Sequence, residues 1–133
     1  MSGMIIDHEV AFIVLIDGAG RVLMQHRGPD KRVEPGRLST PSGLVEPGED
    51  ALTAAHRERL EETGLTADLE LARVLEQIGA DGTVVRLHVF AGSTDARQDD
   101  VVCGEGLAME FLTRQELATR DLASNVWALL GQE

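Results

Sequence analysis

The chain has 133 residues, a formal net charge of -11 at neutral pH, 43% hydrophobic residues and a single cysteine, Cys103. This length and composition predict one domain over residues 1–133 with a sizeable core. The acidic balance leaves no basic stripe for a phosphate backbone, which argues against nucleic-acid binding. A lone cysteine excludes an intramolecular disulfide and a multi-cysteine zinc site.

The N-terminal residues do not read as a targeting segment. They lack a basic region, and Asp7, His8 and Glu9 interrupt the apolar residues. No stretch of the chain approaches the roughly 18 apolar residues of a membrane span. We therefore expect a cytoplasmic protein without membrane association.

The first half of the chain alternates apolar runs with turn residues. An unbroken apolar run is typical of a strand buried on both faces, and Pro or Gly within a run favours a short or broken strand. In chain order we expect a buried strand over 10–16, its hairpin partner over 21–27, a loop over 28–36, a short or broken strand over 37–45, and a helix over 50–63 that Gly64 ends.

The second half contains a clear hairpin signal, Asp81–Gly82, between two runs rich in strand-forming residues. Thr113 and Glu116 have the spacing of a capping box that opens a helix. We expect strands over 67–78 and 83–91, a loop over 92–100, strand-like ends of 101–112 around Gly104–Gly106, a short helix after Thr113, and a terminal helix over 121–130.

The helix over 50–63 concentrates carboxylates. Glu58, Glu61 and Glu62 stand at i, i+3 and i+4, so they share one face of a helix. Like charges at this spacing repel each other, and a hard divalent cation would turn the repulsion into binding. Arg57 is placed to pair with Glu61 one turn later.

The other helix residues divide between two faces. Ala51, Ala54 and Ala55 project beside the acids, where small side chains leave room for a ligand or a strand edge. Leu52 and Arg59 project to a different face, which we expect to pack on a sheet. Either the Arg59 stem runs along the sheet to water, or the helix is rotated slightly toward Leu60.

These positions carry a family resemblance. Gly43, five residues, Glu49, seven residues, Arg57-Glu58, two residues, Glu61-Glu62, one residue and Gly64-Leu65 together resemble the Nudix box. Residues 23–27, 35–43 and 104–111 are similar to the second strand, the segment entering the box and the late strand of MutT-type members. Arg59 stands where the family usually has an aliphatic residue, and Ser42 stands where it usually has glycine.

The resemblance implies an α/β fold, a Nudix-type α/β/α sandwich with a mixed β-sheet. It also implies hydrolysis of a diphosphate bond in a nucleoside diphosphate derivative with Mg²⁺ or Mn²⁺. Glu49 and Arg57 would position the ligands, and either Glu58 or Glu105 would accept the proton of the attacking water. The metal ligands that the resemblance implies are the Ser42 carbonyl, Glu58, Glu61, Glu62 and Glu105.

The substrate class stays open between a nucleoside triphosphate and a nucleotide sugar. Arg27 is the first candidate for a phosphate contact, with Lys31 and Arg37 behind it. Asn125 is either a base-reading residue or a helix cap. The expectation of a homodimer rests on the family resemblance alone. The alternative function is a non-catalytic Nudix-like module that binds a nucleotide and regulates a partner.

Overall fold

A mixed sheet forms the centre of the molecule in the computed structural model, which describes residues 5–32, 34–102 and 108–131. The strand order is β3-β2-β1-β6-β5, while β4 pairs with β1 and β7 pairs with β2. The β1 and β6 strands run parallel, and the other pairs are antiparallel. The strands are β1 His8–Ile16, β2 Val22–His26, β3 Leu38–Ser39, β4 Ser42–Leu44, β5 Glu70–Ile78, β6 Val84–Ser93 and β7 Met109–Leu112.

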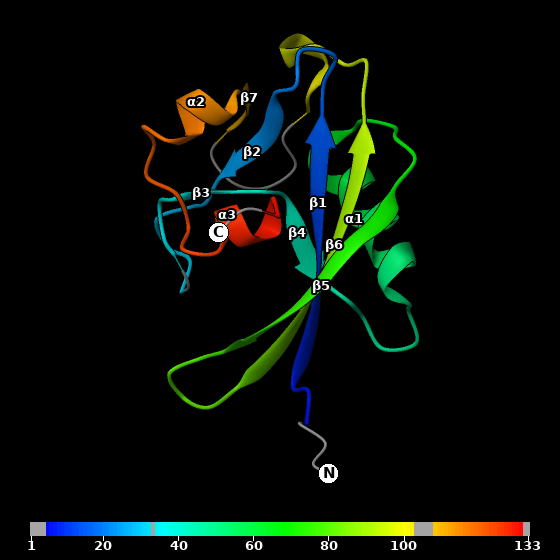
Figure 1. The fold of residues 1–133 in the computed structure, drawn as a ribbon. Helices are drawn as coiled ribbons and strands as arrows, with labels where there is room; N and C mark the ends of the chain where they lie inside the picture. Colours follow the sequence, from blue (N-terminus) through cyan, green and yellow to red (C-terminus); the bar gives the residue numbers. More distant parts are fainter. Residues whose placement is uncertain (1–4, 33, 103–107, 132–133) are drawn as a thin grey trace.

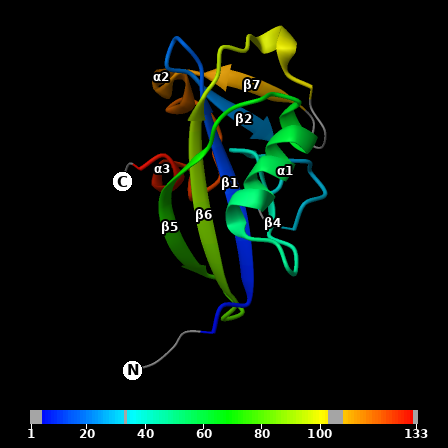
Figure 2. The same cartoon turned by 90° about the vertical axis from the view of Figure 1, so that its right-hand side faces the viewer.

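Helices cover both faces of this sheet (Figures 1 and 2). They are α1 Ala51–Thr63, a 3-10 helix Gln98–Asp100, α2 Arg114–Leu117 and α3 Val126–Leu129. The buried residues form two clusters, one containing α1 and the other containing α2 and α3. The predicted α/β/α sandwich with a mixed sheet is confirmed.

Strand β1 lies between the two clusters and supplies both. Ala11, Ile13 and Leu15 face the α1 side, whereas Phe12 and Val14 face the α2 and α3 side. Successive side chains of a strand point to opposite faces, and helices cover both faces of this sheet, so all five side chains are buried. The prediction of a strand buried on both faces is therefore confirmed, and β1 provides a rigid base for the elements around it.

Local sequence signals fix both ends of α1. The Asp50 side chain caps the first turn by accepting a hydrogen bond from the Thr53 backbone N–H at 2.8 Å. Gly64 ends the helix with φ at 68°, and its N–H donates to the Leu60 carbonyl at 3.0 Å. The capping box of Thr113 and Glu116 is also present with both of its hydrogen bonds.

The terminal helix is shorter than the predicted 121–130. Only Val126–Leu129 is helical, because the preceding segment pairs with β3 instead. The Leu38 N–H donates to the Asp121 carbonyl at 3.0 Å, and the Ala123 N–H donates to the Leu38 carbonyl at 2.8 Å. These two bonds hold the start of the predicted helix in an extended conformation.

The segment 92–102 also differs from prediction. Strand β6 continues to Ser93, and the predicted loop contains the 3-10 helix Gln98–Asp100. Val101 and Val102 form no strand, because the Val102 N–H donates to the carbonyl of Thr63 at the end of α1, at 3.0 Å. None of the described helices is both long and apolar enough to cross a membrane.

Candidate active site

Strand β4 lies directly against the acidic helix. Gly43, in the middle of β4, is held by antiparallel pairing with Ala11 of β1. A β-carbon built on Gly43 would lie 2.0 Å from Cδ of Glu58 and 2.1 Å from its Oε1. Any larger residue would displace the Glu58 carboxylate, so the first glycine of the motif provides the space that this carboxylate occupies.

Arg57 lies at the centre of the carboxylates. Its Nε and Nη2 donate to the two oxygens of Glu49, both at 2.9 Å. Its Nη1 donates to Oε1 of Glu58 at 2.7 Å and to Oε1 of Glu61 at 3.3 Å. Nη2 also donates to the Leu44 carbonyl at 3.0 Å, which joins the helix to β4. One guanidinium thus orients three carboxylates. Of these three contacts, the sequence predicted only the pair with Glu61.

The two nearest carboxylates respond differently to this environment. The hydrogen bonds from Arg57 lower the pKa of Glu49 to about 2. Burial raises the pKa of Glu58, and the hydrogen bond from Arg57 opposes that effect without overcoming it. Glu49 is therefore a fixed anion that anchors Arg57, while Glu58 carries a charge that its surroundings stabilise less.

The remaining two acids differ in exposure. Glu61 is exposed, whereas Glu62 is only 7% exposed and lies against the sheet. Nε2 of Gln25, on β2, donates to Oε1 of Glu62 at 2.9 Å. Glu58 and Glu62 thus point to the strands and Glu61 points to solvent, which agrees with their spacing along the helix.

The donor chemistry of this cluster fits a hard divalent cation. Carboxylate oxygens are the ligands that Mg²⁺ and Mn²⁺ prefer, and Arg57 offsets only part of their charge. Within residues 5–32, 34–102 and 108–131, no three His, Cys, Asp or Glu side chains already converge as a metal cluster. Ser42 lies next to Gly43 in β4 and is half-buried, and the fifth expected ligand, Glu105, lies outside the described residues.

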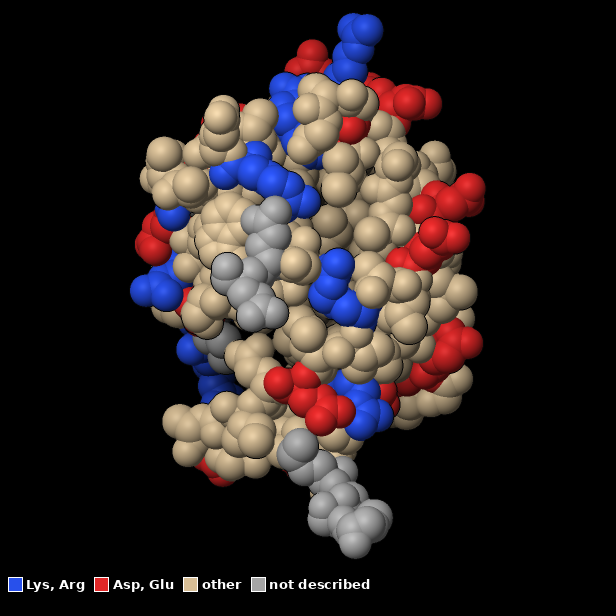
Figure 3. All heavy atoms as spheres, viewed as in Figure 1, with Lys and Arg blue, Asp and Glu red and all other residues tan. Residues whose placement is uncertain are grey.

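The expected phosphate-binding residues, Arg27, Lys31 and Arg37, lie in the segment between β2 and β3. Figure 3 shows blue side chains over the side that carries β3, α2 and α3, and red ones along the edge near α1. Lys31 is exposed, and the Arg27 N–H donates to the Arg37 carbonyl at 2.9 Å. The Arg37 guanidinium is engaged by Glu34 at 2.7 Å and Asp121 at 3.5 Å.

Asn125 immediately precedes α3, yet its side chain does not cap that helix. Its Nδ2 donates instead to Oε1 of Gln77, on β5, at 3.2 Å. The capping interpretation of Asn125 is therefore wrong, while base reading stays a prediction. Its amide lies on the exposed surface, at the junction between α3 and the edge of the sheet.

The predicted packing of α1 is partly wrong. Leu52 is 44% exposed, whereas Ala54 and Ala55 are fully buried against the sheet. The small side chains allow the helix and strands to approach closely, so the alanines pack on the sheet and leave no room for a ligand. This places the packing face beside the acids and turns Leu52 away from the sheet.

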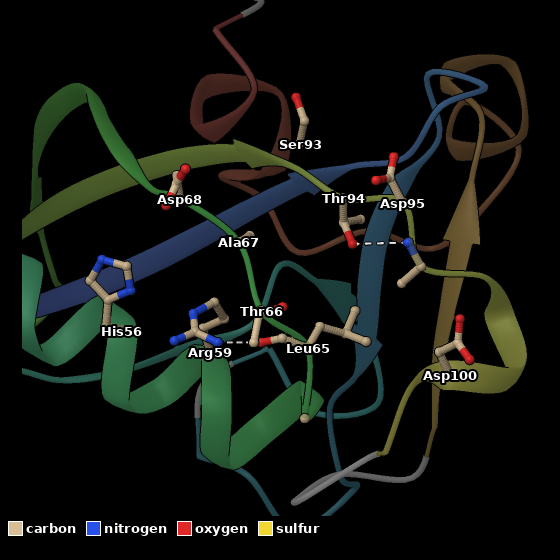
Figure 4. Close-up of a pocket in the computed structure, with 12 residues that line it drawn as sticks. His56, Arg59, Leu65, Thr66, Ala67, Asp68, Ser93, Thr94, Asp95 and Asp100 are labelled. Atoms are coloured by element: carbon tan, nitrogen blue, oxygen red, sulfur yellow. Dashed lines mark hydrogen bonds between the residues drawn. The ribbon is translucent and has the colours of Figure 1, made fainter.

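Arg59 lines an open depression of about 790 Å³ (Figure 4). Its Nη1 donates to the Leu65 carbonyl, so the guanidinium binds the chain just after the helix instead of running along the sheet. None of Glu58, Glu61 and Glu62 lines the depression, whose wall includes His56, Asp68, Thr94 and Asp95.

The sequence analysis did not predict two groups of polar contacts. Gln25 was assigned only to a strand, although alternation along β2 places it on the same face as Leu23, toward α1. On the opposite face, Glu110 accepts from Arg120 at 3.0 Å and lies 2.6 Å from Nε2 of His26. The hydrogen bonds from Arg120 and His26 lower the pKa of Glu110.

Comparisons with known proteins identify the family of this chain. The model of the NUDIX domain family matches residues 7–129, so the chain belongs to the Nudix family. An uncharacterized Nudix hydrolase of Yersinia pestis is 42% identical over 59 residues, which are 44% of this chain and 32% of the relative. YfcD of Escherichia coli K12, also an uncharacterized Nudix hydrolase, is 38% identical over 66 residues, which are 49% of this chain and 37% of YfcD. The matched stretch thus spans about a third of each relative's length.

Solved structures show the same fold. The dihydroneopterin triphosphate pyrophosphohydrolase of E. coli superposes with a TM-score of 0.75 at 27% identity, and 92% of each chain is covered. The Nudix domain of Shewanella oneidensis NrtR, solved with ADP ribose, gives 0.81 at 14% identity over 97% of this chain and 87% of that one. A MutT Nudix hydrolase of Burkholderia pseudomallei gives 0.80 at 22% identity over 94% and 96%.

Proposed function

We propose that this domain hydrolyses a diphosphate bond in a nucleoside diphosphate derivative with the help of Mg²⁺ or Mn²⁺. The observation that carries the proposal is the arrangement of Glu58 over Gly43, with Arg57 orienting three carboxylates around it. Arg57 offsets only part of the negative charge of these carboxylates, so a divalent cation would relieve the repulsion that remains.

The carboxylates have different parts in this proposal. Glu58, Glu61 and Glu62, with the Ser42 carbonyl and Glu105, would hold the metal. Glu49 would fix Arg57, and Arg57 would fix the orientation of Glu58 and Glu61. The bound cation would supply charge neutralisation of the phosphates and a more acidic water.

The reaction needs one proton acceptor from the chain. Water attacks one phosphorus atom, the bond from that phosphorus to the bridging oxygen breaks, and the departing phosphate keeps the bonding electrons. Either Glu58 or Glu105 takes the proton of the attacking water. The products are two phosphate esters, or one ester and inorganic phosphate or pyrophosphate.

The substrate would lie between the acidic helix and the basic segment of the chain. Four of the 12 Lys and Arg residues of this acidic protein fall between Arg27 and Arg37. This charge favours a ligand with several phosphates, and we propose that Arg27 and Lys31 contact it. Arg37 would act mainly by holding its loop through Glu34 and Asp121, and Asn125 would contact the group beyond the phosphates.

Two related structures support this substrate class. One is a pyrophosphohydrolase of dihydroneopterin triphosphate and the other was solved with ADP ribose. Both compounds carry linked phosphates, which is the chemistry that the proposal requires. The homodimer expected from the family belongs to the same proposal and is tested by light scattering of the purified protein.

A hydrolysis screen tests the function. The protein is incubated with Mg²⁺ and a panel of nucleoside triphosphates, oxidised nucleoside triphosphates, dinucleoside polyphosphates and nucleotide sugars, and the phosphorylated products are separated by chromatography. We expect turnover of at least one class, and its loss in EDTA. Tight binding of a nucleotide without any product would overturn the proposal and favour the non-catalytic module.

A further inference from the structure

Gln25 joins the middle of the sheet to the acidic helix. Its Nε2 donates to Oε1 of Glu62 at 2.9 Å across 37 residues of sequence. The backbone of Gln25 is held on both sides, because its register partners are Ser39 of β3 and Met109 of β7. The donor therefore comes from a fixed position in a paired strand and not from a mobile loop.

The hydrogen-bond donor to Glu62 is neutral, whereas the donor to Glu58 and Glu61 is charged. Glu58 and Glu61 accept from the Arg57 guanidinium, which offsets part of their negative charge. Glu62 accepts from a neutral amide. A neutral donor fixes the orientation of a carboxylate and leaves its full charge for another partner.

The burial of Glu62 makes its neutral hydrogen-bond donor important. Glu62 is 7% exposed, so water solvates its charge poorly and the hydrogen bond from Gln25 compensates for part of that loss. A buried carboxylate with one oxygen fixed by a hydrogen bond is suited to present its other oxygen to a cation. Ligating carboxylates in metal sites are commonly oriented by such hydrogen bonds.

We propose that Gln25 is a positioning residue for the metal site, which holds Oε1 of Glu62 so that Oε2 is presented to the divalent cation. This inference rests on the proposed function, because it takes Glu62 as a metal ligand. The Nudix box pattern does not include Gln25, which precedes it by 18 residues.

The test measures Mn²⁺ binding without nucleotide, from the electron paramagnetic resonance signal of the free ion. Gln25→Met keeps the length of the side chain and removes the donor. We expect its dissociation constant for Mn²⁺ to rise by about 10-fold or more, with the thermal unfolding midpoint little changed. The matched control is Gln115→Met, on the exposed surface of α2, which should bind Mn²⁺ as the wild type does.

A double-mutant cycle shows whether Gln25 acts through Glu62. In a Glu62→Gln background, Gln25→Met should cause no further loss of Mn²⁺ affinity. Gln25→Leu, as a second variant of different shape, should give the same pattern. Wild-type affinity in the folded Gln25 variants, or losses that add fully in the double variant, would overturn the inference.

The same experiment separates this inference from the proposed function. If Glu62→Gln weakens Mn²⁺ binding and Gln25→Met does not, the positioning role of Gln25 is wrong and the metal assignment stands. If Glu62→Gln binds Mn²⁺ as tightly as the wild type, the assignment of Glu62 as a metal ligand is itself wrong.

Discussion

Gly43 and Glu58 are in such close contact that the first residue has no room for a side chain: a β-carbon on Gly43 would lie 2.0 Å from Cδ of Glu58. The Glu58 carboxylate is also held by Arg57 at 2.7 Å. Strand β4 and helix α1 therefore fix the position of one carboxylate from two sides. The glycine is required by this contact and not by an unusual backbone angle, since its φ lies outside the left-handed region.

Gly43→Ala should displace the Glu58 carboxylate without unfolding the protein. The atoms it would meet are at the end of a flexible side chain, so Glu58 can rotate away at the expense of its bond to Arg57. We expect metal-dependent turnover to fall by about 10-fold or more, as when the environment of a metal ligand is altered. Steady-state kinetics across a Mg²⁺ titration provide the measurement.

Gly18→Ala is the control for this variant. Apart from its two chain neighbours, no described residue of the chain comes within 4 Å of a β-carbon built on Gly18, and its φ is not positive, so its replacement should leave turnover unchanged. Equal turnover in Gly43→Ala and Gly18→Ala would contradict the role assigned to the Gly43 contact.

The ion pair of Glu49 and Arg57 should make stability depend on pH. The Arg57 hydrogen bonds lower the pKa of Glu49 from 4.5 to about 2 in the folded protein. A folded pKa below the unfolded value stabilises the protein above pH 4.5, and this contribution is lost as the pH falls from there to about 2. Chemical unfolding of the wild type and Glu49→Gln should therefore show a stability difference at pH 6 that shrinks by about pH 2.

A second measurement assigns the effect to Arg57. NMR titration of the side-chain carboxyl carbon should place the pKa of Glu49 near 2 in the wild type and closer to 4.5 in Arg57→Gln. A Glu49 pKa that is the same in both proteins would show that Arg57 is not its cause.

Asp17 should stabilise the turn between β1 and β2. Its Oδ1 accepts from the backbone N–H groups of Ala19 at 3.0 Å and Arg21 at 2.8 Å, and its Oδ2 accepts from Nε of Arg21 at 2.8 Å. Asp17→Ala leaves these donors without their partner, so we expect a loss of about 1–3 kcal/mol in the free energy of unfolding. Denaturant titration measures it.

Asp81→Ala is the matched comparison, because Asp81 lies in the exposed β5–β6 turn, where it accepts from the Thr83 backbone N–H at 2.9 Å. Its cost should be clearly smaller than that of Asp17→Ala. A larger cost at Asp81 would contradict the importance given to the buried turn.

Arg59 should be dispensable for catalysis. It donates to the Leu65 carbonyl and lines a depression that Glu58, Glu61 and Glu62 do not line, and its Nε is buried with no hydrogen-bond partner among the described residues. Arg59→Leu loses one hydrogen bond but also removes a poorly satisfied group, so we expect unfolding free energy to change by only about 1 kcal/mol. Turnover should stay within about twofold of the wild type.

Arg57→Leu, on the same helix, supplies the contrast for Arg59→Leu. Loss of the guanidinium that orients Glu49, Glu58 and Glu61 should lower turnover by about 10-fold or more. The same kinetic assay compares the two variants. Equal activities would show that the arginine network does not organise the site.

Features with local causes could be predicted from the sequence. The ends of α1 depend on Asp50 and Gly64, which interact within four residues along the chain, and the capping box of Thr113 is equally local. The spacing of Glu58, Glu61 and Glu62 placed the three acids together on the helix, but their different exposure was seen only in the structure. These signals involve neighbours in sequence, so tertiary packing did not override them.

Features that depend on distant contacts could not be predicted. The segment after Asp121 is extended because it bonds to Leu38, and Leu52 is exposed because small alanines allow α1 to approach the sheet along another face. The bond from Gln25 to Glu62 also joins residues 37 apart. The spacing of residues within one helix or strand does not show which residue of another helix or strand will contact them.

The most direct test of the account compares turnover of the wild type and Glu62→Gln on the best substrate from the screen, with Mg²⁺ at saturation for the wild type. Gln at position 62 can still accept from Gln25, so the fold should be kept, as circular dichroism would show. The account predicts a loss of turnover of about 100-fold or more in the folded variant. Turnover equal to that of the wild type would contradict the central claim that the helix carboxylates act through a bound metal.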